Sequence, residues 1–135
     1  MNGKHKIFVY GTLRRGECRW PALEHSEYLG EAVTEASFEL ADLGPFPGLV
    51  RGGATPVVGE CYRVDDATLA RLDTIEQHPR FYVREAVKLA DGTMAMAYLL
   101  NQEQTQGAPR IASGDWVRHR AAREGCPGAP QADRL

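Results

Sequence analysis

The chain has 135 residues, of which 43% are hydrophobic and 25% are charged, and its net charge is −2 at pH 7. This length is sufficient for one domain with a single core, which we expect over residues 1–124. Lysine and arginine are scattered along the chain, so we expect no nucleic-acid partner. Residues 1–5 are polar and the apolar run 7–10 is short, which indicates neither a signal peptide nor a membrane span.

The spacing of cysteines and histidines indicates no metal site. The three cysteines, Cys18, Cys61 and Cys126, are widely spaced and odd in number, which is typical neither of a disulfide framework nor of a CxxC metal site. The four histidines also lack a metal-binding spacing. We therefore expect a reduced, cytoplasmic setting.

Strand patterns recur along most of the chain. In chain order, they predict strands over residues 5–10, 28–43, 56–64, 81–89 and 93–100. The cluster GPFPG at 44–48 predicts a rigid loop, and the pair Asp91 and Gly92 predicts a hairpin turn.

Two segments have helical patterns. One covers residues 65–77 and has an aspartate cap at Asp65 or Asp66, and the other covers 113–123 with Ser113 as its cap. Residues 125–135 are rich in proline and glycine, so we expect a disordered tail. Five or six strands with two short helices, and no regular β-α-β alternation, argue against a doubly wound sheet. We expect a small, mostly β barrel or curled sheet with a helix packed across one mouth.

Glu76 is the most informative residue of the sequence. At about 100° per residue, Leu69, Leu72 and Glu76 fall on one face of the predicted helix. The helix should end near Gln77, because the residue before Pro79 is disfavoured in the α region. Burial and the negative end of the helix dipole would both raise the pKa of this carboxyl group, which is typical of a general base.

Helix geometry alone leaves other interpretations of Glu76 open. It could be an exposed residue of the last turn, or it could pair with Arg71, Arg80 or Arg84. Asp73 lies three positions earlier, on the flank of the apolar stripe, so a hydrolase with two carboxylates is also conceivable.

The loop YGTLRRG, residues 10–16, directly follows the first strand. A strand that runs into Gly11 leaves backbone N–H groups without ladder partners, and the glycine lets a ligand approach the backbone. Such a turn can hold a carboxylate or carbonyl oxygen, with Thr12 Oγ as a further donor, and Arg14 and Arg15 would favour an anion. The plain alternative is an ordinary turn.

Tyr82 and Arg84 alternate with apolar neighbours, so their side chains should share one face. If that face points inward, both residues could bound a polar pocket. Alternatively, Arg84 pairs with Glu76 or Asp73 and holds the helix in place. We expect Tyr98 in the core; the alternative is that its hydroxyl reaches the site.

Taken in order, the segments YGTLRRG, DLGPFPGLV, VVGECYRVD and LARLDTIEQHPRFYVRE resemble the gamma-glutamylcyclotransferase-like family, and SGDW at 113–116 resembles its small bacterial YtfP-type members. The similarity runs from about residue 7 to residue 117. It implies an α+β fold, namely a small mixed-strand β barrel flanked by short helices. It also implies cyclisation of a γ-glutamyl group, which releases 5-oxoproline and an amine or amino acid.

The resemblance implies one catalytic glutamate, Glu76, and six substrate-binding residues: Tyr10, Gly11, Thr12, Leu13, Tyr82 and Arg84. Many members have glycine directly after the glutamate, whereas residues 77–79 here are Gln-His-Pro, which resembles the gamma-glutamylamine branch. Some YtfP-type relatives lack the glutamate, so its presence favours activity.

In the implied mechanism, the α-amine of a small γ-glutamyl substrate attacks its own γ-carbonyl while Glu76 accepts a proton and later delivers one to the leaving amine. The mechanism needs no metal or organic cofactor. The alternative is a non-catalytic module that binds a small carboxylate-bearing metabolite in the same pocket. The leaving group stays open between an amine, an amino acid, a dipeptide and an antibiotic side chain.

Overall fold

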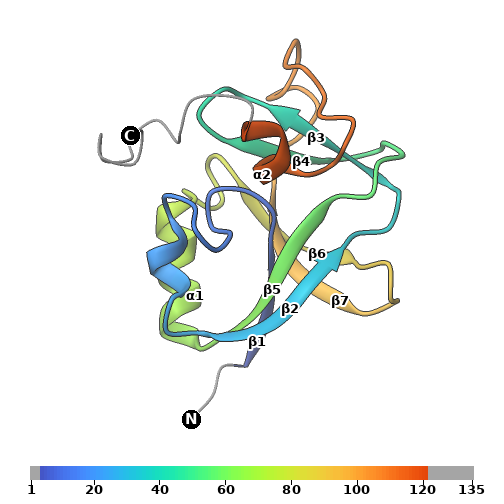
Figure 1. Cartoon of the computed structure of the whole chain (residues 1–135). Coiled ribbons are helices and arrows are strands. Elements are labelled where there is room, and N and C mark those ends of the chain that lie inside the picture. Colours follow the sequence, from blue (N-terminus) through green and yellow to red (C-terminus); the bar gives the residue numbers. More distant parts are fainter. Residues whose placement is uncertain (1–3, 122–135) are drawn as a thin grey trace.

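A computed structural model describes residues 4–121 of the protein. Its main element is a mixed sheet of seven strands: β1 (His5–Val9), β2 (Glu27–Val33), β3 (Phe38–Asp42), β4 (Pro47–Arg51), β5 (Val58–Val64), β6 (Val83–Lys88) and β7 (Met94–Leu99). The helical elements are the 3-10 turn η1 (Trp20–Leu23), α1 (Asp66–Ile75) and α2 (Trp116–Arg120). Figure 1 shows η1 and α1 together on one side of the curled sheet, and α2 beside β3 and β4. The α+β class expected from the sequence is confirmed.

The sheet forks at β7. The strand order is β2-β5-β1-β7-β4-β3, and β6 pairs with β7 along its other edge. On the forked edge, β1 meets β7 in parallel at Ile7 and Met96, and β4 meets it in parallel at Leu49 and Leu99. Because β1 and β4 share this edge of β7 and do not pair with each other in the described sheet, the sheet opens between them.

The sheet curls strongly without becoming a fully hydrogen-bonded barrel. The ends of β2 and β6 approach each other through a single antiparallel bridge between Thr34 and Leu89. Backbone hydrogen bonds on either side support this bridge. The curled sheet that was the second of the two expected architectures is therefore the better description.

One strand was missed by the sequence patterns. The GPFPG cluster, expected as a rigid loop, runs directly into β4 at Pro47, where the first position of a strand tolerates proline. The first four residues of β4 are all buried, so the polar–apolar alternation that normally marks a strand is absent. The second helix also begins later than expected, because Asp115 rather than Ser113 caps α2.

Successive residues of β1 belong to two hydrophobic clusters. Ile7 and Val9 pack in the cluster that includes Leu72 of α1, and Phe8 packs in the cluster that includes Trp116 of α2. Of these five residues, none is more than 2% exposed. Because β1 is packed from both faces, the loop that follows it is held firmly in position.

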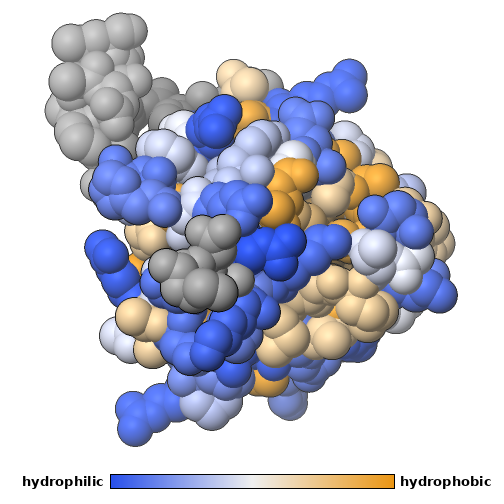
Figure 2. Space-filling view, turned by 90° about the horizontal axis from the view of Figure 1, so that it is seen from below, coloured by the Kyte–Doolittle hydropathy of each residue, from blue (hydrophilic) through white to orange (hydrophobic). Residues whose placement is uncertain are grey.

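The surface seen in Figure 2 is mostly hydrophilic, with hydrophobic residues gathered on one part of that face. The large hydrophobic side chains that are exposed among the described residues are Tyr28, Val83 and Met94. Within residues 4–121, no helix has the length and apolar character that crossing a membrane requires.

The cysteines differ from expectation at one position. Cys61 is buried and free, whereas Cys18 is disulfide-bonded, although the cysteine spacing indicated no disulfide framework. The expected tail over residues 125–135, and the end of the expected domain at 124, lie outside the described residues.

Candidate active site

A narrow pocket lies at the fork of the sheet, where the loop after β1 meets the end of α1. Its cavity volume is about 20 Å³, and it is lined by Phe8, Val9, Tyr10, Gly11, Thr12, Leu13, Pro47, Glu76, Tyr82 and Tyr98. Of the site residues expected from the sequence, all except Arg84 therefore line one pocket. We call this cavity the inner pocket.

Glu76 is a buried carboxylate directly after the last residue of α1. Its exposed fraction is 6%, and α1 buries Leu69 and Leu72 in the same core. Arg19 Nη1 donates a hydrogen bond of 2.9 Å to Glu76 Oε2, and the Arg19 side chain is 42% exposed. Burial raises the pKa of the Glu76 carboxyl group, and the charge and hydrogen bond of Arg19 partly oppose this shift. The expected burial is confirmed, but the partner is Arg19 and not an arginine nearby in sequence.

The local sequence explains where α1 begins and ends. The Asp65 side chain accepts a hydrogen bond of 2.8 Å from the N–H of Thr68, as expected for its cap. Gln77 has a φ of 58°, in the left-handed region, which stops the helix just after Glu76. The Ile75 carbonyl accepts a hydrogen bond from Arg19 at 3.4 Å. The carbonyls of Thr74 and Asp73 accept hydrogen bonds from the backbone N–H groups of Gln77 and His78. The end of the helix is therefore well capped, and burial is the main cause of the raised pKa of Glu76.

The loop after β1 presents backbone donors to the inner pocket. Within the described part of the chain, no residue accepts a hydrogen bond from the N–H of Gly11, Thr12 or Leu13, and all three residues are buried. Buried N–H groups without protein partners are uncommon, and they are suited to bind an oxygen ligand. The expectation that this turn offers free donors is confirmed.

Gly11 is required by packing against β4. A Cβ atom at Gly11 would lie 2.5 Å from Pro47 Cγ and 2.8 Å from Pro47 Cδ, which is far inside the contact distance. The glycine thus lets the loop lie against β4, whereas its position after the first strand indicated that it admits a ligand.

Two tyrosines form walls of the inner pocket and hold the fork together. The Tyr10 hydroxyl donates to the Tyr98 carbonyl at 2.6 Å and accepts from the Leu49 N–H at 3.0 Å, so it bridges β7 and β4. The Tyr82 hydroxyl donates to the Pro47 carbonyl at 2.7 Å. Burial raises the pKa of both hydroxyl groups, so both remain protonated at neutral pH.

Arg84 lies outside the inner pocket and holds Asp73. Its guanidinium forms a close ion pair with Asp73 Oδ2, and the Tyr98 hydroxyl donates to Asp73 Oδ1 at 2.7 Å. Partial burial would raise the pKa of Asp73, but the hydrogen bonds from Arg84 and Tyr98 outweigh it and hold the pKa below its ordinary value. Both oxygens of Asp73 are engaged, which disfavours a hydrolase in which Asp73 works with Glu76.

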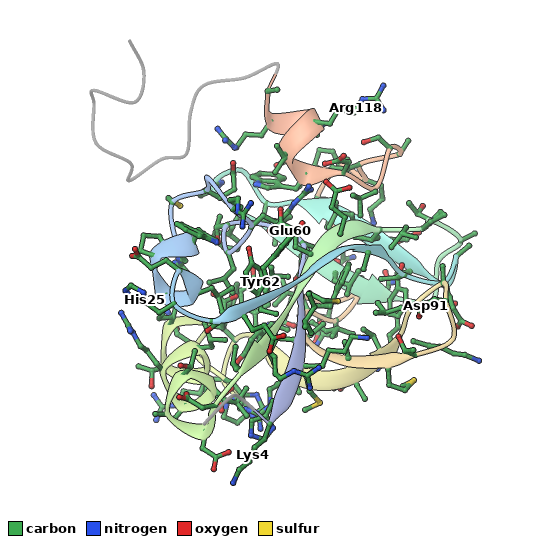
Figure 3. All side chains as sticks on the ribbon, turned by 60° about the horizontal axis from the view of Figure 1, so that its bottom comes forward. Lys4, His25, Glu60, Tyr62, Asp91 and Arg118 are labelled. Atoms are coloured by element: carbon green, nitrogen blue, oxygen red, sulfur yellow. The ribbon has the colours of Figure 1, made fainter. Side chains whose placement is uncertain are left out.

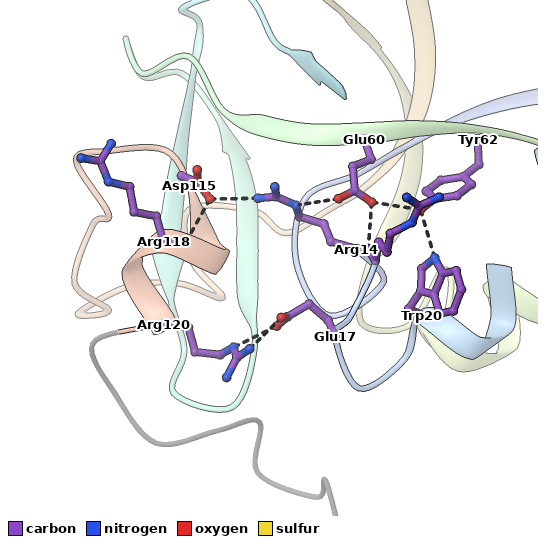
Figure 4. A network of polar contacts seen from close by, with 9 residues as sticks. Arg14, Glu17, Trp20, Glu60, Tyr62, Asp115, Arg118 and Arg120 are labelled. Carbon is purple, nitrogen blue, oxygen red and sulfur yellow. Dashed lines mark hydrogen bonds and ion pairs between the residues drawn. The ribbon is translucent and has the colours of Figure 1, made fainter. Parts of the chain in front are cut away.

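Arg14 is part of a buried polar network that anchors the loop (Figure 4). It contacts Glu60 Oε2 at 3.4 Å and Asp115 Oδ1 at 2.9 Å. Glu60 also accepts hydrogen bonds from the Arg15 N–H and the Tyr62 hydroxyl. Figure 3 shows Glu60 and Tyr62 in the interior of the molecule, on β5. Arg14 therefore joins the loop to β5 and α2, where two carboxylates compensate its charge, and it does not provide the anion site that was expected.

A larger cavity, the outer cleft, adjoins the inner pocket. Its cavity volume is about 230 Å³, and it is lined by Arg19, Phe46, Ile75, Glu76, Gln77, Phe81 and Tyr82. Glu76 and Tyr82 line both cavities, so the carboxylate lies at their junction. Sequence reasoning missed Arg19 because it is 57 positions from Glu76 and no local pattern joins them.

The fold and the pocket define a small α+β protein with a forked, curled sheet and a buried glutamate facing a turn of free backbone donors. The family model described as "Gamma-glutamyl cyclotransferase, AIG2-like" matches residues 7–118. A Vibrio cholerae protein provisionally named as a gamma-glutamylcyclotransferase is 45% identical over 115 residues, which cover 85% of this chain and 97% of the relative.

Two further comparisons agree. The gamma-glutamylcyclotransferase family protein YtfP of Escherichia coli K12 is 37% identical over 114 residues, which cover 83% of this chain and 96% of the relative. The crystal structure of an AIG2-like protein of Mus musculus superposes with a TM-score of 0.72 at 29% identity, and the match covers 84% of this chain and 90% of that chain. The chain belongs to the gamma-glutamylcyclotransferase family, a family of enzymes.

Proposed function

We propose that the protein cyclises a γ-glutamyl amine or a small γ-glutamyl peptide to 5-oxoproline, with Glu76 as general base and general acid. One observation carries the proposal: a buried carboxylate with a raised pKa and a turn with free N–H donors line the same narrow pocket. A carboxylate of raised basicity suits proton transfer near neutral pH, and the donors suit a developing oxyanion.

The reaction balances without a co-reactant. Glu76 accepts a proton from the substrate's α-ammonium group, and the free amine attacks the γ-carbonyl carbon, forming the C–N bond of a five-membered ring. The N–H groups of Gly11, Thr12 and Leu13 stabilise the oxyanion. When the tetrahedral intermediate collapses, the original amide C–N bond breaks and Glu76 returns the proton to the leaving nitrogen. The ring nitrogen then still carries a second proton, which the Glu76 carboxylate takes up and passes to the released amine, so the products are 5-oxoproline and an ammonium group.

Positioning supplies much of the rate in this proposal. Well-oriented intramolecular reactions reach effective molarities of about 10⁵ M or more, so a pocket that folds the glutamyl chain back on itself lowers the barrier substantially. Glu76 Oε2 is held by Arg19, while Oε1 has no protein partner among residues 4–121 and is available to the substrate. The chemistry uses no metal or organic cofactor.

The test is release of 5-oxoproline from a panel of γ-glutamyl compounds. We expect Glu76→Gln to lower kcat/KM by about 10²- to 10⁴-fold, the usual contribution of general acid–base catalysis. Glu85→Gln is the matched control, because Glu85 also pairs with an arginine, Arg51, but lies outside both cavities. Full activity of Glu76→Gln would refute the assignment of the base.

A second candidate function is a non-catalytic module that binds a small carboxylate-bearing metabolite. The observation that favours it is the ion pair of Glu76 with Arg19, since a paired glutamate can also be structural. Saturable binding of a γ-glutamyl compound without release of 5-oxoproline across the panel would support the module. Free glutamate as the product would instead indicate a hydrolase.

A further inference from the structure

We propose that the outer cleft is the leaving-group subsite and that it selects γ-glutamyl amino acids with an aromatic side chain. In this assignment, Arg19 binds the α-carboxylate of the leaving amino acid, and Phe46 and Phe81 contact its ring. The inference rests on the proposed cyclisation and adds the class of substrate.

The position of Glu76 assigns the two cavities to the two halves of the substrate. A single carboxylate that takes a proton from the α-amine and returns it to the leaving nitrogen must lie beside both atoms. The free backbone donors line the inner pocket, whose volume of about 20 Å³ suits a single oxygen atom, so the γ-glutamyl group binds with its γ-carbonyl oxygen in this pocket. From the leaving nitrogen at Glu76, the rest of the substrate extends into the other cavity that Glu76 lines, the outer cleft.

The outer cleft has an aromatic wall. Phe46 and Phe81 are only partly buried, and their rings meet edge to face, with centroids 5.8 Å apart and an interplanar angle of 86°. Both rings also contact Tyr82 edge to face, at 6.2 Å and 5.2 Å, which fixes their orientation. A third aromatic ring can join such a cluster in the same geometry. The cavity volume of about 230 Å³ leaves room for a side chain of that size.

Arg19 is suited to hold a carboxylate at the mouth of this cleft. Its Nη1 serves Glu76 and the Ile75 carbonyl, while its Nε and Nη2 have no protein partner within the described residues. A guanidinium has five N–H donors in a planar fork, so donors remain for a second carboxylate. A leaving group that is an amine without a carboxylate would leave these donors to water, and a cationic leaving group would meet like charge.

Three substrates test the contact of Arg19 with the carboxylate separately from the contact of Phe46 and Phe81 with the ring. They are γ-glutamylphenylalanine, γ-glutamylphenethylamine, which lacks only the carboxylate, and γ-glutamylalanine, which lacks only the ring. For the wild-type enzyme, we expect kcat/KM for γ-glutamylphenylalanine to exceed each of the others by about 10-fold, the effect of one charge-assisted hydrogen bond or one buried ring.

Ratios between substrates isolate the subsite from any effect on the Glu76 base. Arg19→Gln should bring the ratio of γ-glutamylphenylalanine to γ-glutamylphenethylamine close to one and preserve the preference for the phenyl ring. Phe46→Ala should bring the ratio of γ-glutamylphenylalanine to γ-glutamylalanine close to one and preserve the preference for the carboxylate. Arg51→Gln is the matched control, because Arg51 is also about half exposed and paired with a glutamate, but lies outside both cavities. It should leave both ratios unchanged.

The outcomes distinguish this inference from the proposed function. If 5-oxoproline is released from all three compounds at equal kcat/KM, or if both ratios survive in Arg19→Gln and Phe46→Ala, the subsite is refuted and the cyclisation stands. If no compound is turned over, the proposed cyclisation fails. The subsite is then decided by calorimetry on the wild-type protein: tighter binding of γ-glutamylphenylalanine that Arg19→Gln abolishes supports it, and equal or absent binding overturns it.

Discussion

The pKa of the Glu76 carboxyl group depends on two opposing effects, the burial of Glu76 and the charge of Arg19. Burial raises the pKa of the Glu76 carboxyl group, and the guanidinium beside it lowers the pKa again. Because the Arg19 side chain is 42% exposed, solvent screens part of its effect on the pKa of Glu76. Burial therefore has the larger effect on this pKa. The net result is a carboxyl group whose pKa is raised.

Removal of Arg19 should therefore be visible in the pH profile. In Arg19→Gln, the charge that lowers the pKa of Glu76 is absent, so the acid limb of kcat/KM should move to higher pH. The measurement is kcat/KM for γ-glutamylalanine across the acid range. If the midpoint of the acid limb stays at the same pH or moves to lower pH, Arg19 does not act on the titrating group. Arg51→Gln is the control and should leave the midpoint unchanged.

The same carboxylate should cost stability at neutral pH. Its pKa is raised in the folded state, so folding favours the protonated form, and this contribution is lost as pH rises from the unfolded to the folded pKa. Above that window, Glu76→Gln, which is never charged, should have the higher Tm. Below it, the two proteins should converge. A Tm difference that is independent of pH would contradict this account.

At the scale of the elements, the sequence predicted α1 best. The aspartate cap and the leucine stripe act within one helix, so the spacing placed Glu76 on the leucine face, although helix geometry alone also allowed an exposed position. Arg19 could not be found in this way, because its contact with Glu76 depends on how η1 packs against α1. The pairing of Asp73 with Arg84 was one of two alternatives, and the close ion pair between them decides it.

The loop after β1 depends on a close approach to β4. We expect Gly11→Ala to destabilise the protein by about 1–3 kcal/mol, the usual cost of overpacking, because the new Cβ meets Pro47 Cγ and Cδ. Pro47→Ala removes both of these atoms, so the double variant should be little less stable than Pro47→Ala alone. The free energy of unfolding in urea measures both. Simple additivity of the two substitutions would show that the contact is not the cause.

At the scale of the whole molecule, the fork at β7 explains why a pocket exists at all. Strands β1 and β4 leave the same edge of β7 at different points, and no ladder closes the space between them. The sequence patterns found strands one at a time and could not show this, since pairing partners are set by contacts between distant segments. The missed β4 is one side of the fork.

Between Tyr98 of β7 and Leu49 of β4, the Tyr10 hydroxyl replaces a direct backbone hydrogen bond, because it bonds to the carbonyl of one and the N–H of the other. A residue expected from the sequence as a substrate contact thus also helps to hold β7 and β4 together. The outer cleft is different, because Arg19 and Phe46 belong to loops beside the sheet and form no part of its ladder. One wall of the site is therefore built from the sheet and the other from loops, so we expect substitutions of Arg19 or Phe46 to change the outer cleft and leave the sheet intact.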